Sequence, residues 1–109
     1  MATTNKILGG QKPAAATLTT LYVVPSSMQS VATIFIANQS PTNDDTFNIM
    51  LLPNGQSEDD KWYIAKYSDI GKGTAISFTS TALGAGDQIK VASQFGYVSF
   101  VATGLETTY

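Results

Sequence analysis

The sequence predicts an all-β protein, an antiparallel two-sheet β-sandwich of seven or eight strands. Short runs rich in β-branched and aromatic residues recur along the chain, and turn-forming residues separate them about every 8–14 residues. Several runs alternate apolar with polar residues, the period of a strand with one buried face. No stretch sustains the period of an amphipathic helix. These features are typical of immunoglobulin-like sandwiches and of jelly rolls, and the residues do not distinguish the two.

The composition narrows the range of functions. The 109 residues suit one domain, and the charged fraction of 13% is about half the usual ~25%. A surface so poor in charge is common in extracellular or particle-bound β-proteins. The chain contains no histidine, cysteine or arginine, which excludes disulfides, thiolate chemistry, zinc fingers and histidine-based acid–base catalysis. We therefore expect a protein that is not an enzyme and has no cofactor.

Charge and hydropathy also bear on the partners. Six lysines and eight acids give a net charge of −2, too little positive charge to attract a nucleic-acid backbone. No run approaches the ~20 apolar residues of a membrane span, and the first ten residues lack the apolar core of a secretory signal. We expect neither nucleic acid nor a membrane as partner, and synthesis in a cytoplasm.

The first 17 residues are the least strand-like part of the chain. Lys6, Ile7 and Leu8 form a short apolar step that Gly9-Gly10 ends, and a proline and alanine connector follows. We expect residues 1–17 to be an arm and connector, and residues 18–109 to be a single β-sandwich domain. Lys6, Ile7 and Leu8 are candidate subunit contacts, because so short a segment could add as an edge strand to a neighbour's sheet. The alternative is that they pair within their own sandwich.

The expected strands are residues 18–24, 31–38, 46–52, 62–67, 74–80, 88–92 and 97–102. In the strand 31–38 both alternating sets are largely apolar, which predicts a central strand but leaves open which set faces the core. We expect the strand 46–52 to pair antiparallel with it. The predicted core contains Val31 or Ile34, Phe35 or Ile36, Phe47, Ile49, Ile76, Phe78, Ile89, Val91, Val98 and Phe100.

Two acidic clusters could suggest calcium. Asp44-Asp45 and Glu58-Asp59-Asp60 lie in loops at opposite ends of the strand 46–52, which is about 23 Å long at the usual rise per residue. Neither cluster has the spacing of a known calcium loop. We interpret them as solvated turn residues and expect no metal site.

Aromatic residues gather near residue 62. Rings can stack on sugars, since they present flat apolar faces with polar edges. Trp62 alternates with Ile64, which favours a tryptophan in the core and tyrosines pointing outward. Tyr63, Tyr67 and Tyr97 are the candidate exposed aromatic patch.

Several segments together resemble a known family. The pattern consists of an L-T-x-x-Y-x-V-P strand at residues 18–25, an N-x-S turn at Asn38-Gln39-Ser40, and the aromatic segment Tyr63-Ile64-Ala65. Over residues 6–106 the chain resembles the small β-sandwich virion proteins of tailed bacteriophages, particularly those infecting marine bacteria and cyanobacteria. It departs from that pattern in loops, at Asp59-Asp60 and Gly10.

The resemblance implies a structural protein without catalysis, made in the host cytoplasm and incorporated into the virion. Such a protein decorates or bridges subunits of the capsid, neck or tail in many copies. Its partners would be other virion proteins and further copies of itself. The alternative is a host-surface or carbohydrate-binding module, which an exposed patch of Tyr63, Tyr67 and Tyr97 would favour.

Overall fold

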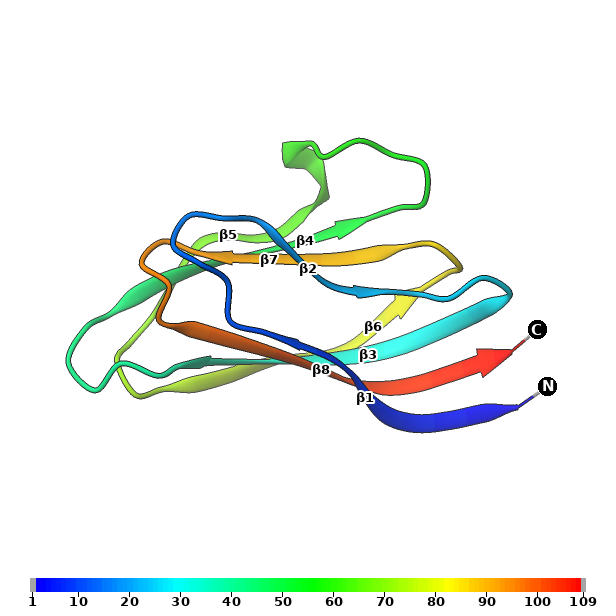
Figure 1. Ribbon diagram of the computed structural model, residues 1–109, viewed down its shortest axis with the longest axis horizontal. Helices are drawn as coiled ribbons and strands as arrows, with labels where there is room; N and C mark the ends of the chain where they lie inside the picture. Colours follow the sequence, from blue (N-terminus) through cyan, green and yellow to red (C-terminus); the bar gives the residue numbers. More distant parts are fainter. Residues whose placement is uncertain (1, 109) are drawn as a thin grey trace.

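The computed structural model describes residues 2–108, apart from the side chain of Ser80, and it confirms the all-β sandwich. Two four-stranded antiparallel sheets pack face to face (Figure 1). The described residues form eight strands and one short 3-10 helix: β1 (Thr3–Gln11), β2 (Thr19–Val23), β3 (Met28–Asn38), β4 (Asp45–Leu52), η1 (Asp60–Trp62), β5 (Tyr63–Ile70), β6 (Ala75–Leu83), β7 (Gln88–Ser93) and β8 (Val98–Thr108). Within these residues no helix is long and apolar enough to cross a membrane.

The strand order resolves the topology. One sheet has the order β1-β8-β3-β6 and the other β2-β7-β4-β5. The first strand pairs with the last, the second with the seventh, the third with the sixth and the fourth with the fifth. The chain is thus one long antiparallel ribbon rolled into two sheets, which is a jelly roll and not an immunoglobulin-like sandwich.

The central position of β3 is confirmed, but its predicted pairing with the strand 46–52 is wrong. β3 has β8 along one side and β6 along the other, so no edge remains for β4. The chain instead crosses to the other sheet after Asn38. The Asn38 amide nitrogen donates to the carbonyls of Asn43 at 3.0 Å and Ile70 at 3.1 Å, and its oxygen accepts the Ser40 N–H at 2.9 Å. A buried asparagine therefore holds the crossing.

The core lies between the sheets, and it settles which face of β3 is buried. Ile34 and Ile36 are fully buried, whereas Val31 and Phe35 are 44% and 49% exposed on the opposite face. Six further residues of the predicted core are fully buried, which confirms them: Phe47, Ile49, Ile89, Val91, Val98 and Phe100.

The prediction is less accurate at β6, an edge strand. Phe78 is only partly buried, with its ring centroid 6.2 Å from that of Phe47. Ile76 is wrongly predicted in the core, because it is 41% exposed. It lies opposite Ile36 on the inward side of the sheet, but an edge strand is poorly covered by the facing sheet.

The predicted arm 1–17 is corrected. β1 pairs with β8 of the same chain from Thr3 to Gln11, so these residues belong to the sandwich, as in the alternative of local pairing. The register shifts between Ile7 and Gly9, where β1 comes close to β2. A Cβ atom at Gly9 would lie 2.3 Å from the Leu21 carbonyl oxygen, so only glycine fits there.

Candidate functional site

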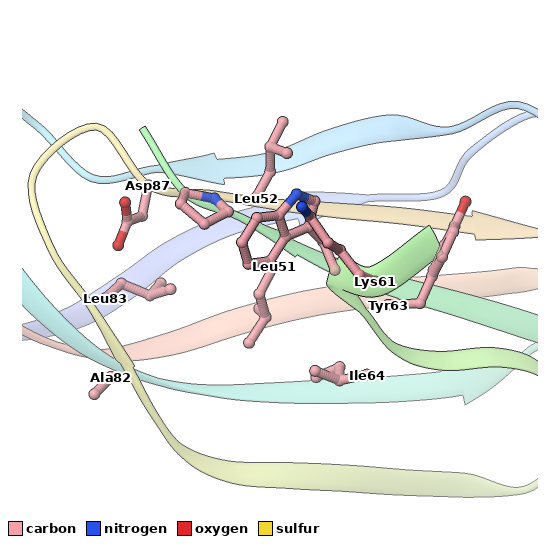
Figure 2. A pocket seen from close by; sticks show the side chains of 10 residues that line it. Leu51, Leu52, Lys61, Tyr63, Ile64, Ala82, Leu83 and Asp87 are labelled. Carbon is pink, nitrogen blue, oxygen red and sulfur yellow. The ribbon is translucent and has the colours of Figure 1, made fainter. Parts of the chain in front are cut away.

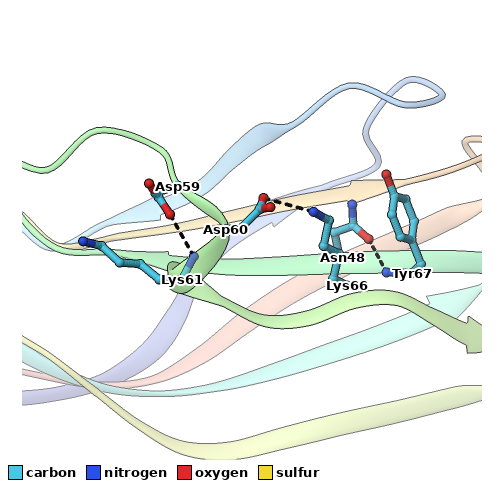
Figure 3. A network of polar contacts seen from close by, with 6 residues as sticks. All are labelled: Asn48, Asp59, Asp60, Lys61, Lys66 and Tyr67. Carbon is cyan, nitrogen blue, oxygen red and sulfur yellow. Dashed lines mark hydrogen bonds and ion pairs between the residues drawn. The ribbon is translucent and has the colours of Figure 1, made fainter.

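The longest connection between the described strands joins β4 to β5 (Figure 1). Residues 53–62 leave the sheet and end in η1, which Asp59 caps by accepting the Lys61 N–H at 3.1 Å (Figure 3). Met50 lies opposite Lys90 on the outward side of β4, yet it is only 1% exposed, and η1 contacts this strand. The excursion therefore covers one end of the outward face of the sheet β2-β7-β4-β5.

A bulge in β5 projects Tyr67 from the sheet. The pairing with β4 shifts between Phe47 and Ile49, where β5 has one residue more than its partner. Tyr67 has a φ of 52°, which costs of the order of 1–3 kcal/mol for a residue other than glycine. Its N–H donates to the Asn48 side-chain oxygen at 2.7 Å (Figure 3), and its side chain is 66% exposed. The backbone is thus held in a strained form that displays the ring.

A lysine lies between two tyrosines beside this bulge. The Lys66 Nζ is 5.1 Å from the ring centroid of Tyr63 and 5.7 Å from that of Tyr67. The same atom pairs with Asp60 Oδ1 at 3.0 Å, and this hydrogen bond raises the pKa of Lys66 (Figure 3). We call Tyr63, Lys66 and Tyr67 the tyrosine platform.

A hollow of about 580 Å³ adjoins the platform. Besides the two tyrosines, Ala16, Leu18, Asn48, Ser93 and Gln94 line it. Aromatic rings beside amide and hydroxyl groups are the combination that binds sugars, because the rings contact C–H groups while the polar atoms hydrogen-bond to hydroxyls.

The third predicted tyrosine does not join this site, which corrects the expected patch. Tyr97 lies in the loop between β7 and β8, and its N–H donates to Asp45 Oδ2 at 3.1 Å. Its ring centroid is 6.3 Å from that of Phe95, and the two rings line a separate hollow of about 180 Å³ with Asn43 and Asp44. The structure thus brings together Tyr63 and Tyr67 alone.

Trp62 is not in the core, contrary to the prediction. It ends η1, so the alternation of β5 begins after it, and Ala65 is the inward residue while Ile64 is 46% exposed. The indole is partly buried and lines an apolar hollow of about 320 Å³. Figure 2 shows this hollow, which lies between the edges of the two sheets. Leu51 and Leu83 line this hollow from opposite sheets. The Trp62 Nε1 is buried there without a hydrogen-bond partner.

The three candidate contacts of the first strand have three different environments. Ile7 is 71% exposed, whereas Leu8 packs against the core. The Lys6 Nζ lies 2.7 Å from Glu106 Oε1, and Glu106 is only 4% exposed. The other carboxylate oxygen of Glu106 accepts the Tyr22 hydroxyl proton at 2.5 Å.

The trio of Lys6, Tyr22 and Glu106 was not predicted from the sequence. Hydrogen bonds from Lys6 and then Tyr22 lower the pKa of Glu106, although burial opposes them. Burial, followed by the bond to Glu106, raises the pKa of Tyr22 to about 12. A signal did exist, because Glu106 continues the inward alternation of Val98, Phe100 and Ala102 beyond the predicted end of the last strand.

Acidic side chains of both clusters accept hydrogen bonds from backbone N–H groups. Asp45, 2% exposed, accepts the N–H groups of Thr46 at 2.7 Å, Phe95 at 3.1 Å and Tyr97 at 3.1 Å. Asp59 caps η1, as described above. Within residues 2–108 no group of three or more acidic residues is placed to hold a metal ion.

Comparison with known proteins adds no relative: the chain matches no family model and no curated protein.

Proposed function

We propose that this chain is a non-enzymatic structural protein of a tailed-bacteriophage virion, present in many copies as a decoration or bridging component of the capsid, neck or tail. The resemblance of residues 6–106 to small phage virion proteins supports this role. The fold is compatible with it, since jelly rolls occur in viral capsid domains and also in lectins. The likeness to capsid jelly rolls is an analogy of fold, because one fold serves many functions.

The observation that carries the proposal is the open sheet β1-β8-β3-β6. Among the described strands β1 pairs only with β8, and β6 only with β3. Each edge strand is nine residues long, and residues 3–7 and 75–77 are all exposed. Long free edges invite pairing with other chains, which a soluble monomer usually prevents with charges or short strands. Neighbouring subunits of a particle would cover them.

The composition is consistent with a scaffold role. The chain has neither histidine nor cysteine, so a thiolate nucleophile and a histidine proton carrier are missing. Its few acidic side chains in loops are used as hydrogen-bond acceptors for backbone, as at Asp45 and Asp87. Virion assembly needs surfaces and stability rather than a reactive group.

Quantitative mass spectrometry of purified particles tests the proposal. We expect the chain to co-purify with virions of the virus that encodes it, in a fixed ratio to the major capsid protein and many copies per particle. Particle maps by cryo-electron microscopy would then place it on capsid, neck or tail. Abundant expression in infected cells with no chain in washed particles would contradict the proposal.

A second candidate function is binding of host-surface carbohydrate, favoured by the tyrosine platform and its hollow. Chemical shifts in titrations with host polysaccharide fragments would test it. Binding should be lost in Tyr67→Ala and retained in Tyr97→Ala, because Tyr97 lines a different hollow. Equal effects of the two substitutions would contradict a site at the platform.

A further inference from the structure

We infer that the outward face of the sheet β1-β8-β3-β6 is an interface between two copies of this chain, which pack sheet against sheet. We call the exposed apolar residues of this side, Ile7, Val31, Phe35, Val101 and Leu105, the outer face. The inference rests on the proposed function, because it names the surface and the first partner of a multi-copy structural protein.

Strand register places these five residues on one side of the sheet. Phe35 of β3 lies opposite Val101 of β8, and Val31 lies opposite Leu105. Opposite residues of an antiparallel pair point to the same face. Ile7 of β1 lies in the row between these two pairs. The outer face therefore consists of two apolar pairs and Ile7 across three adjacent strands, with Thr33 and Thr103 in the row between the pairs.

Each of these residues is exposed to solvent by more than a third. The exposed fractions are 71% for Ile7, 49% for Phe35, 44% for Val31, 38% for Leu105 and 37% for Val101. Single exposed apolar residues are ordinary on a protein surface, whereas five on one side of a sheet point to an interaction site.

Charge points to a second copy as the occupant. The chain has six lysines and eight acids, but within the described strands of this sheet only Lys6 and Glu106 are charged. These two pair with each other, and Glu106 is buried on the inward side. Two copies with net charge −2 would repel if their charges met, whereas this face brings none together. A charged partner would find no complement here.

The other sheet shows the contrast. Its outward side carries Lys90, which pairs with Glu58 at 2.9 Å, and the charged tyrosine platform. The excursion 53–62 already covers Met50 on that side. In Figure 1 this excursion stands beyond β4, away from the sheet β1-β8-β3-β6. The excursion thus covers part of the outward side of one sheet, whereas the described residues leave the outer face of the sheet β1-β8-β3-β6 exposed.

The available area is sufficient for a stable dimer. With strands ~4.8 Å apart and ~3.3 Å per residue, the strands of 9, 11, 11 and 9 residues give a face of roughly 630 Å². Two such faces would bury roughly 1,300 Å², within the roughly 1,200–2,000 Å² of specific interfaces. A two-fold axis through the sheet makes the contact self-complementary, with Phe35 and Val101 on its two central strands.

Sedimentation velocity of the purified full chain over a concentration series tests the inference. We expect a monomer–dimer equilibrium for the unchanged chain. Val31→Lys should raise the dissociation constant at least about tenfold, because the symmetry buries two lysines without partners.

The chain offers a matched control in Val23→Lys. Val23 is the same residue at 46% exposure, against 44% for Val31, but it lies in β2 of the other sheet. Val23→Lys should leave the dissociation constant within about twofold, since surface substitutions away from a contact have small effects. Circular dichroism and thermal unfolding at low concentration show whether each variant is folded, and Val101→Lys replaces Val31→Lys if the latter is not.

Two outcomes would overturn the inference: a monomeric unchanged chain throughout the series, or equal effects of Val31→Lys and Val23→Lys. The proposed function fails separately. A monomer that is present in virions overturns only this inference, whereas a dimer that is absent from virions overturns the proposed function.

Discussion

A buried carboxylate ties the two sheets together at the end where both termini lie (Figure 1). Glu106 of β8 receives hydrogen bonds from Lys6 of β1 in its own sheet and from Tyr22 of β2 in the other. A carboxylate that is 4% exposed would be strongly destabilising without these donors. These hydrogen bonds therefore fix the positions of β1, β2 and β8 relative to one another at this end of the sandwich.

The titrations of Glu106 and Tyr22 set the pH window in which these contacts stabilise the fold. The lowered pKa of Glu106 means that its stabilisation is complete above the ordinary value of 4.5 and is lost as the pH falls through the lowered value. The raised pKa of Tyr22 means that its stabilisation is complete below the ordinary value of 10.0 and is lost as the pH rises through about 12.

Replacing the carboxylate tests this account. Glu106→Gln should lower the free energy of unfolding by about 1–2 kcal/mol at neutral pH, since it removes two charge-assisted hydrogen bonds while Lys6 stays half exposed. The difference from the unchanged chain should shrink below pH 4.5, as urea unfolding at several pH values would show. Glu58→Gln is the control, because Glu58 is 51% exposed and its pair with Lys90 contributes at most about 1 kcal/mol. A difference that does not change with pH would contradict the role of Glu106.

At the scale of elements, β1 contributes both to the trio around Glu106 and to the packing of the core. β1 supplies Lys6 to the trio and Leu8 to the packing against the core, and it covers one side of β8. Close approaches fix neighbouring strands as well: a Cβ atom at Gly104 would lie 2.1 Å from the Val31 carbonyl oxygen. β1 is thus part of the fold, even though it is an edge.

Deletion of residues 1–10 measures that contribution. The truncation removes the Leu8 packing and leaves Glu106 without Lys6, so we expect a loss of about 3 kcal/mol or more in unfolding free energy. Thermal and urea unfolding would detect it. As control, Ile7→Thr alters a side chain that is 71% exposed and should change stability by no more than about 0.5 kcal/mol at low protein concentration. Unchanged stability of the truncated chain would contradict this contribution of β1 and would favour the predicted arm at residues 1–17.

At the scale of the whole molecule, the sheet β1-β8-β3-β6 has apolar residues both in the core between the two sheets and on the outer face. Phe100 and Phe35 lie on adjacent strands of one sheet, but Phe100 is fully buried between the sheets and Phe35 is 49% exposed on the outer face. The first ring stabilises the sandwich, and in our proposal the second serves association.

A matched pair of truncations separates the two tasks. Phe100→Ala should cost about 3–5 kcal/mol of unfolding free energy, because a large cavity opens in a packed core. Phe35→Ala should cost less than about 1 kcal/mol when unfolding is measured at low concentration, where the chain is monomeric. Equal losses in urea unfolding would show that the face of β3 is assigned wrongly.

Local chemistry was sufficient to predict most strands. Branched and aromatic residues favour the pleated backbone, while glycine, proline and asparagine end it, and both effects act within a few residues. For this reason the strands predicted at residues 18–24, 46–52 and 88–92 begin and end within one residue of their predicted bounds. The lack of histidine and cysteine likewise limits the chemistry without reference to a structure.

The candidate sites were predicted less well, because they depend on neighbours distant in sequence. Tyr63 and Tyr67 share a hollow because a bulge in β5 projects one of them, while Tyr97 was grouped with them only by its type. Glu106 is a site residue only because β1 and β2 bring Lys6 and Tyr22 to it.

The sequence by itself determined that this chain forms an antiparallel β-sandwich, since the period of two and the turn residues are local properties. Tertiary structure alone decided that β3 buries Ile34 and Ile36 and exposes Val31 and Phe35. Both alternating sets of β3 are apolar, so the choice between them depends on which side meets the facing sheet. The pairing of β1 with β8 was decided in the same way, because a three-residue apolar step acquires a partner only when the two ends of the chain meet.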